Sequence, residues 1–150
     1  MASFNTLYID DIIDSFEKLA NTPEETINEM LIASGDVLVK EQKLTAEAKG
    51  LQHTGKMISS IDRDNKVREE RGGTAKIITV YPRGTHHIYK ARKGGNKVAR
   101  NADVAFVQNY GAPLKNIKAT HFIDEANEKA EPEIYKTQEE IYNKKIDELF

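Results

Sequence analysis

A helix-start signal followed by a long apolar stripe constrains the fold of this chain more than any other feature. The signal is Thr22-Pro23-Glu24-Glu25, in which Thr22 can cap a helix, Pro23 suits its first position and Glu25 can complete a capping box. Apolar side chains then recur at the three- and four-residue steps of one helical face. They are Ile27, Met30, Leu31, Val37, Leu38, Leu44 and Ala48. In a chain of 150 residues, a helix this long is expected to lie across a sheet or against a partner.

Two glycines mark the course of this helix. Gly35 lies inside the stripe and lowers the stability of the helix by about 1 kcal/mol relative to alanine. Gly50 follows the stripe and can end the helix in the left-handed conformation. Upstream, residues 9–19 predict a shorter amphipathic helix that ends near Asn21. Its apolar positions are Ile9, Ile12, Ile13, Phe16 and Leu19.

The pattern changes after residue 50. Thr54 is expected to cap a short helical turn that directs Met57, Ile58 and Ile61 inward. Residues 62–73 are almost wholly polar, which predicts an exposed, mobile strand and loop. The helical arm therefore gives way to a region of shorter elements.

The clearest predicted strand covers residues 75–81, which are rich in β-branched side chains and are followed by Pro82. Residues 85–91 are expected to be its hairpin partner across the turn at residues 82–84. A second turn is predicted at residues 93–96, which contain two glycines. This region is therefore expected to form the sheet.

Helical signals return toward the end of the chain. Residues 102–107 resume apolar order and residues 110–113 break it. A short helix is predicted to begin at Phe122, and Pro132 is expected to start a second one. One side of that second helix carries Ile134, Tyr135, Gln138, Ile141, Tyr142 and Leu149. The order of elements predicts an α+β fold: a small antiparallel sheet flanked by a long N-terminal helix and a C-terminal helix.

Composition narrows the function. The chain has no cysteine, which excludes disulfides, thiolate zinc sites and cysteine nucleophiles. No apolar run approaches the roughly 20 residues that span a bilayer, and the first residues do not resemble a signal peptide. We therefore expect a protein assembled in a reducing cytoplasm, with no membrane partner.

Catalytic and metal-binding patterns are not evident. Of the four histidines, His86 and His87 are adjacent in a predicted strand and are expected on opposite faces, where they could not hold one metal together. Zinc-protease spacing, a nucleophile elbow and a phosphate-binding loop are missing from the sequence. We expect no catalytic residues, no metal and no cofactor.

Charge is unevenly distributed, although the net charge is only −2. Residues 1–30 are rich in acids, whereas residues 83–100 contain bases and no acid. The bases are Arg83, Lys90, Arg92, Lys93, Lys97 and Arg100. Two interpretations stay open: a solvated hairpin, or a surface that faces nucleic acid or an acidic partner.

Three segments together resemble a known family. Residues 54–61 read TGKMISSI and resemble its TG-x-L-x-x-S-I start. Residues 100–111 read RNADVAFVQNYG and resemble its RNAEVAF-x-x-EYG block, and residues 121–126 resemble its entry to a C-terminal helix. The family is the gene-product-ten-like head–tail connector and tail-completion proteins of long-tailed phages and prophages. Its motif positions with structural roles are Thr54, Gly55, Ile61, Asn109, Tyr110, Gly111 and Phe122.

Two positions depart from the family pattern. Asn109 stands where the family usually has glutamate, and His121 where it has proline before Phe122. If the glutamate makes a contact between subunits in relatives, that contact must differ here. Gly111 is still expected to supply a turn, and Phe122 to anchor the last helix.

The resemblance implies a single tail-completion domain, with residues 1–50 as a helical arm and residues 51–150 as the family core. It implies a non-enzymatic virion protein, assembled in the host bacterial cytoplasm, which can be monomeric when free. In the virion it is expected to form a ring of six copies at the neck or tail top. The expected partners are the head connector or adaptor and the tail tube or tail terminator, with genome DNA passing through the lumen without sequence-specific binding.

Other functions are kept beside this one. A minor tail or tail-terminator protein would share partners but dock elsewhere, since a fold does not decide a position in an assembly. A DNA-binding accessory protein would use residues 83–100. A hydrolase is the weakest alternative, because it needs a convergent pocket that the sequence does not indicate.

Overall fold

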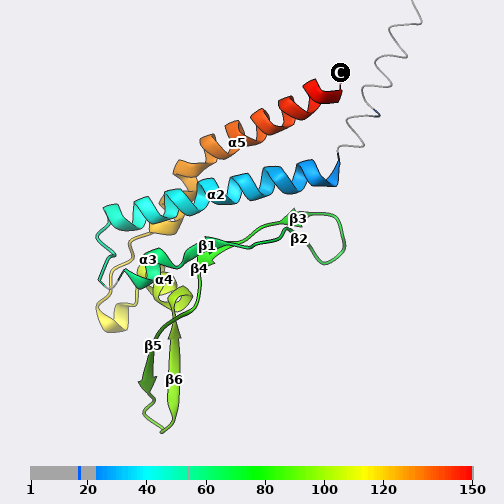
Figure 1. Ribbon diagram of the computed structural model, residues 1–150. Helices are drawn as coiled ribbons and strands as arrows, with labels where there is room; N and C mark the ends of the chain where they lie inside the picture. The colour runs from blue at the N-terminus through cyan, green and yellow to red at the C-terminus, as the bar shows by residue number, and fades with distance from the viewer. Residues whose placement is uncertain (1–16, 18–22, 54, 150) are drawn as a thin grey trace, which may run out of the picture.

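Two long helices lie side by side above a narrow ribbon of short strands, and a hairpin extends away on the far side (Figure 1). This computed structural model describes residue 17, residues 23–53 and residues 55–149. The predicted helix over residues 9–19, apart from Glu17, lies outside the described residues, as do Thr22 and Thr54. The predicted α+β fold is confirmed: a long N-terminal helix and a C-terminal helix flank small antiparallel sheets.

Helix α2 (Glu24–Ala48) begins and ends close to the predicted residues. Pro23 is its N-cap rather than its first residue, and no side chain caps this end. The negative charges of Glu24 and Glu25 in the first turn instead interact favourably with the positive end of the helix dipole. Gly50 adopts φ 71°, so its predicted left-handed conformation beyond the helix end is confirmed.

The apolar stripe of α2 is not its buried face. Leu44 is 49% exposed and Ala48 is exposed, although both belong to the stripe. The buried positions are mostly small or polar: Thr26, Ser34, Gly35, Gln42, Thr45 and Ala46. The reason is that α2 packs on two sides at once, against the antiparallel helix α5 (Phe122–Leu149) and against the strands, so its buried face is not the most apolar one.

Hydrogen bonds pair some of the polar groups between α2 and α5. Ser34 Oγ donates to the Met30 carbonyl (2.6 Å) and accepts from Gln138 Nε2 (2.8 Å). About two helical turns later, Gln42 Nε2 donates to Asn127 Oδ1 (3.4 Å). Buried polar groups are tolerated when they are paired in this way.

Gly35 has a packing role that explains its presence within a helix. A Cβ atom at this position would lie 2.8 Å from Cδ of Arg63, a distance that real structures do not show. Arg63 crosses the glycine and donates from Nε to Asp36 Oδ1 (2.7 Å). The helix-weakening residue therefore allows a strand to approach α2 closely.

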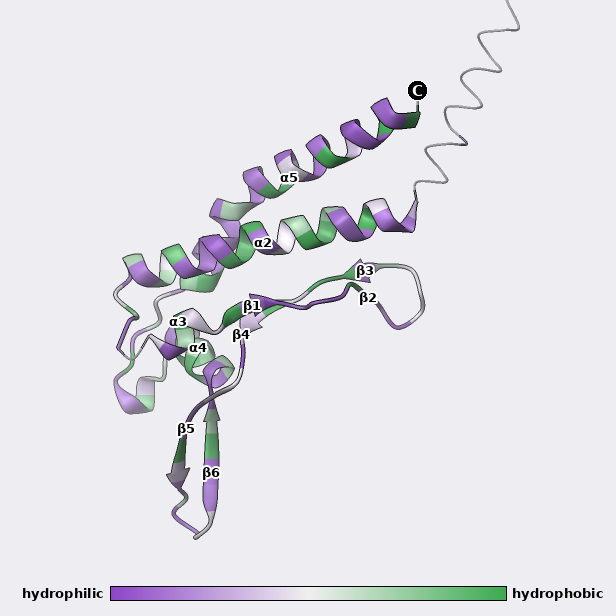
Figure 2. Cartoon of the chain, viewed as in Figure 1, coloured by the Kyte–Doolittle hydropathy of each residue, from purple (hydrophilic) through white to green (hydrophobic). Residues whose placement is uncertain are grey.

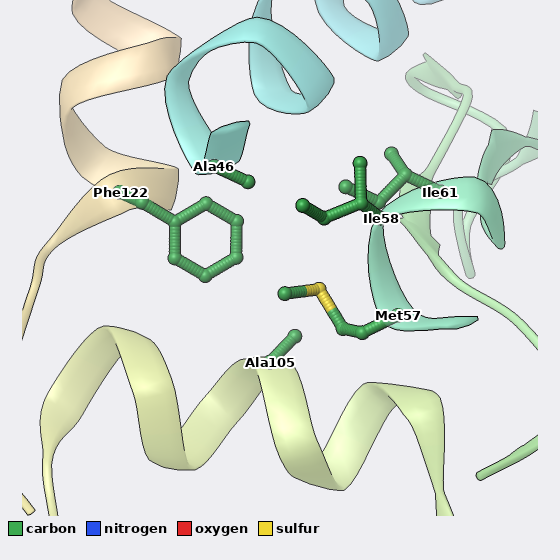
Figure 3. Packing of buried hydrophobic residues seen from close by; sticks show 6 residues of the cluster. All are labelled: Ala46, Met57, Ile58, Ile61, Ala105 and Phe122. Atoms are coloured by element: carbon green, nitrogen blue, oxygen red, sulfur yellow. The ribbon is translucent and has the colours of Figure 1, made fainter. Parts of the chain in front are cut away.

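The apolar core is small and lies where α2, α5 and two short helices meet (Figure 3). Helix α3 (Lys56–Ser59) begins after its N-cap Gly55, which has a φ of 69°. The predicted inward positions Met57, Ile58 and Ile61 are all confirmed as buried. They surround Phe122, together with Ala46 and Ala105.

The strands form three antiparallel pairs, β1 with β4, β2 with β3 and β5 with β6. Their bounds are β1 (Ile61–Arg63), β2 (Arg68–Glu69), β3 (Lys76–Ile77), β4 (Val80–Pro82), β5 (Thr85–Lys90) and β6 (Asn96–Arg100). The predicted strand over residues 75–81 is thus divided in two. Its predicted pairing with residues 85–91 is wrong, since residues 61–69 are its partner and residues 96–100 pair with β5.

The side chain of Asp64 explains why the ribbon pairs in this way. Its Oδ1 accepts from Arg83 (2.8 Å), and its Oδ2 accepts from the Thr79 backbone N–H (3.1 Å) and from Arg68 (3.0 Å). The bond from Arg83, more than the other contacts, holds the pKa of Asp64 below its ordinary value. One carboxylate therefore connects the segment after β1 to the residues just before and just after β4.

The last third contains helix α4 (Asn101–Tyr110), a short 3-10 turn η1 (Pro113–Lys115) and α5. The predicted break at residues 110–113 is confirmed. The predicted second helix starting at Pro132 is wrong, because α5 continues through this proline. Pro132 is exposed, and the carbonyl that loses its helical donor belongs to exposed Glu128, where it can be solvated. Ala126 and Ala130, both buried, precede the proline on the packed side of α5.

We expect Phe122→Ala to lower the free energy of unfolding by about 3–5 kcal/mol, because it opens a cavity at the centre of the only cluster that joins all four helices described. Urea unfolding followed by circular dichroism measures this value. Leu114→Ala is the control: Leu114 is fully exposed, and its loss should change the value by less than about 0.5 kcal/mol. Equal effects of the two substitutions would contradict this core.

We expect Asp64→Asn to lower the free energy of unfolding by about 1–2 kcal/mol at neutral pH, since it removes charged hydrogen bonds. A carboxyl whose pKa is lower in the folded state stabilises above its unfolded pKa, near 3.8, and this contribution is lost as the pH falls through the folded-state pKa. The difference between parent and variant should therefore shrink below about pH 4. Urea unfolding at several pH values, with exposed Asp62→Asn as control, checks this, and a difference independent of pH would contradict it.

Candidate interaction surface

The β5–β6 hairpin projects from the body of the protein and contacts it mainly through α4 (Figure 1). Its strands pair from Thr85 opposite Arg100 to Lys90 opposite Asn96. The turn between them closes with hydrogen bonds between Ala91 and both Gly94 and Gly95, so the predicted turn at residues 93–96 is confirmed. Figure 2 shows apolar residues midway along the strands and hydrophilic residues toward the tip.

The structure divides the six basic candidates into two groups. Arg83 donates to Asp64 and lies over the Tyr81 ring, 4.4 Å from its centroid. Arg100 pairs with Asp103 (2.9 Å) and helps to begin α4. Both arginines therefore have structural partners and do not form part of a free basic surface.

The other four bases lie on the hairpin or at its turn: Lys90, Arg92, Lys93 and Lys97. All four are exposed, and within the described part of the chain none has an ion pair. They form a cluster of unneutralised positive charge at the end of the projection. We call this group the basic tip.

The two histidines at the base of the hairpin are closer than the sequence predicts. The Nδ1 atoms of His86 and His87 are 2.8 Å apart, so the expectation that these side chains diverge is wrong. The cause is an irregularity in the strand between Thr85 and His87, which breaks the alternation of faces. At this distance one ring can donate a hydrogen bond to the other.

Beyond the irregularity, the hairpin has two unlike faces. Ile88 and Val98 lie directly opposite each other on one face and are 64% and 50% exposed. Tyr89 and His87 lie on the other face, where with α4 they line a recess of about 550 Å³. The Ile88–Val98 pair is therefore apolar surface that nothing in the described chain covers.

A second apolar surface lies on α4 and η1. Phe106 and Tyr110 are 61% and 56% exposed, and their ring centroids are 4.8 Å apart. Leu114, in η1 after the break at Gly111, is fully exposed. We call these three residues the aromatic patch. Lys115 and Lys118 follow it in the chain and are exposed.

The family-like residues near the end of α4 are packing residues. Asn109 is fully buried; its Oδ1 accepts from the Ile123 backbone N–H (2.9 Å), and its Nδ2 donates to Asp124 Oδ2 (3.2 Å). This side chain thus satisfies a free amide at the start of α5. A buried residue makes no contact between subunits, so the departure from glutamate acts inside this protein.

Gly111 is required by its surroundings. Its φ is 79°, and a Cβ atom would lie 2.8 Å from the Ala119 nitrogen and 2.9 Å from the Ile117 oxygen. The expected turn at Gly111 and the core position of Phe122 are both confirmed. Ile61 lies in the same core cluster, whereas Tyr110 is exposed.

A groove between α2 and α5 is the surface that sequence reasoning missed. It has a volume of about 490 Å³ and is lined by Leu38 of α2 and by a stretch of α5 from Asn127 to Gln138. Ile134 and Tyr135 line it with Leu38, while Glu128 and Glu131 supply carboxylates. The three- and four-residue spacing of these α5 positions is the signal that could have indicated it.

Acids outnumber bases along α5, and Glu128 and Glu131 line the groove. Glu25 and Glu29 of α2 lie further along the helix pair, near Lys145. At the other end of the α2–α5 pair, Glu125 bonds Lys129 and Lys49, which lowers its pKa to about 2. Much of the predicted acidic region, residues 1–30, lies outside the described residues.

Side chains of the types that catalyse reactions or bind metals do not cluster into one site in the described part of the chain. No three or more histidines, aspartates or glutamates there are placed to hold a metal ion. None of the helices described is long and apolar enough to cross a membrane. The features that stand out are surfaces: the basic tip, the Ile88–Val98 pair, the aromatic patch and the α2–α5 groove.

Comparisons with models of protein families, with curated proteins and with solved structures found no match to this chain. The resemblance to tail-completion proteins therefore rests on the residues that carry it and stays a prediction.

Proposed function

We propose that this protein is a structural subunit of the neck or tail top of a long-tailed phage, where copies assemble into a ring around the path of the DNA. The observation that carries the proposal is the balance of buried and exposed side chains. Among the described residues, more large hydrophobic side chains are exposed than are buried in the core. Contiguous exposed apolar surface marks interaction sites, and assembly would cover it.

The placement of the exposed surfaces also supports a ring subunit. The hairpin, the aromatic patch and the α2–α5 groove belong to different elements and lie in different parts of the molecule (Figure 1). A ring subunit touches its two neighbours through two unlike surfaces and the adjoining layers through others. Several separate surfaces fit this requirement better than one pocket does.

The residues that carry the family resemblance serve packing. Ile61, Asn109 and Phe122 are buried, and Gly111 makes a close backbone contact. Motif residues that maintain a fold suit a structural protein, and this packing role supports the proposal of an assembly protein.

Electron microscopy of a phage lysate with a stop codon in this gene tests the proposal. We expect filled heads beside separate, finished tails, because the subunit that joins them is missing. Normally joined particles would contradict a neck role. Heads without tails, or tails of irregular length, would replace it with the tail-terminator alternative.

Complementation makes the same test specific to a surface. A plasmid copy carrying Phe106→Ser and Tyr110→Ser should fold but fail to restore joined particles, because the aromatic patch would lose its apolar contact. Ile77→Ser, an exposed apolar residue of β3 outside the three surfaces, is the matched control and should restore them. Equal rescue by both variants would show that the patch is not used.

The basic tip favours a second candidate, a DNA-binding accessory protein. Four unpaired cations could neutralise up to four phosphates, and the logarithm of the binding constant would then fall with the logarithm of salt with a slope of about −3.6. Duplex binding by the isolated protein with this slope, weakened by Arg92→Glu and Lys93→Glu together, would favour it. Absence of duplex binding at low salt would exclude this candidate.

A further inference from the structure

The exposed face of the hairpin combines apolar surface with positive charge. Ile88 and Val98 form its centre, and Lys90 lies two residues beyond Ile88 on the same face. Arg92 and Lys93 follow at the turn, whereas Lys97 lies opposite Tyr89 on the other face. A surface of this kind needs a partner that offers both an apolar recess and negative charge.

The α2–α5 groove offers both properties. Leu38, Ile134 and Tyr135 supply apolar lining, and Tyr135 is itself largely exposed. Glu128 and Glu131 stand along the same recess, and neither has an ion pair within the described residues. The groove is therefore complementary to the hairpin face in charge and in polarity.

The two surfaces cannot meet within one molecule. The hairpin points away from the α2–α5 pair, with the strand ribbon and α4 between them (Figure 1). A contact between them must join two copies. Such a contact uses a different surface on each copy, and repetition of it produces a closed ring when the rotation per subunit allows.

We propose that the β5–β6 hairpin of one copy docks in the α2–α5 groove of the next. The Ile88–Val98 pair covers the apolar lining, and the basic tip faces Glu128 and Glu131. This inference rests on the proposed function in one respect: it specifies the contact that builds the ring.

Other occupants fit the hairpin less well. A DNA backbone would neutralise the basic tip but leave the Ile88–Val98 pair exposed. The aromatic patch of a second copy would cover the apolar pair, but Lys115 and Lys118 beside it would repel the tip. The groove alone among the described surfaces accounts for both properties of the hairpin.

The chain contains no cysteine, so single introduced cysteines report contacts without background thiols. We expect a mixture of the Val98→Cys and Tyr135→Cys full-length proteins, oxidised at high concentration, to give a disulfide-linked dimer several-fold above the level in either protein alone. Thr74→Cys mixed with Tyr135→Cys is the matched control, because Thr74 is exposed in the β2–β3 loop. Denaturing gels without reductant measure the yield.

Other results would overturn the proposal. A dimer formed equally well by Val98→Cys alone would indicate hairpin-to-hairpin pairing, and a mixture that does not exceed the Thr74→Cys control would exclude the contact. In the first mixture, Lys90→Glu on the Val98→Cys protein should lower the yield, and Glu128→Lys on the partner should restore it. Circular dichroism confirms that each variant is folded. If Glu128→Lys does not restore the yield, charge complementarity does not contribute to the contact.

The outcome is separable from that of the proposed function. Specific cross-linking with normally joined particles in the stop-codon lysate would preserve the contact between copies and exclude the neck role. Loss of joined particles without specific cross-linking would preserve the neck role and exclude this contact.

Discussion

The packing of the Phe122 ring is the interaction on which the rest of the structure depends. Its ring is fully buried among residues of α2, α3 and α4, although it begins α5, so one side chain brings four helices together. Elsewhere along the α2–α5 pair the fully buried side chains are polar or alanine, and such contacts orient helices more than they drive their association. The core is small because only this junction concentrates apolar side chains.

Polar groups complete what this small core leaves unspecified. Asp64 sets the pairing of the strand ribbon, and Asn109 joins the end of α4 to the start of α5. Each satisfies backbone amides that would otherwise lack partners. Unpaired buried polar groups cost free energy, so these side chains select one arrangement among the several that a few apolar contacts allow.

Because the core is small, apolar side chains remain exposed on the surface. Apolar side chains that a larger single domain would bury are exposed on the hairpin, on α4 and along the α2–α5 groove. The hairpin carries positive charge and the groove negative charge, at separate ends of the molecule. The assembly proposed for this protein would bury these side chains against neighbouring copies.

Local patterns in the sequence determined the fold class, the bounds of α2, the inward positions of α3, the hairpin turn and the glycine at residue 111, because capping, helical period and glycine geometry act between residues close in the chain. Tertiary contacts decided which face of α2 is buried, which strands pair, and that α5 continues through Pro132. They also removed Arg83 from the free basic residues, since it pairs with Asp64, 19 residues away in the chain. These outcomes depend on residues far apart in the chain, whose meeting no local period or spacing encodes.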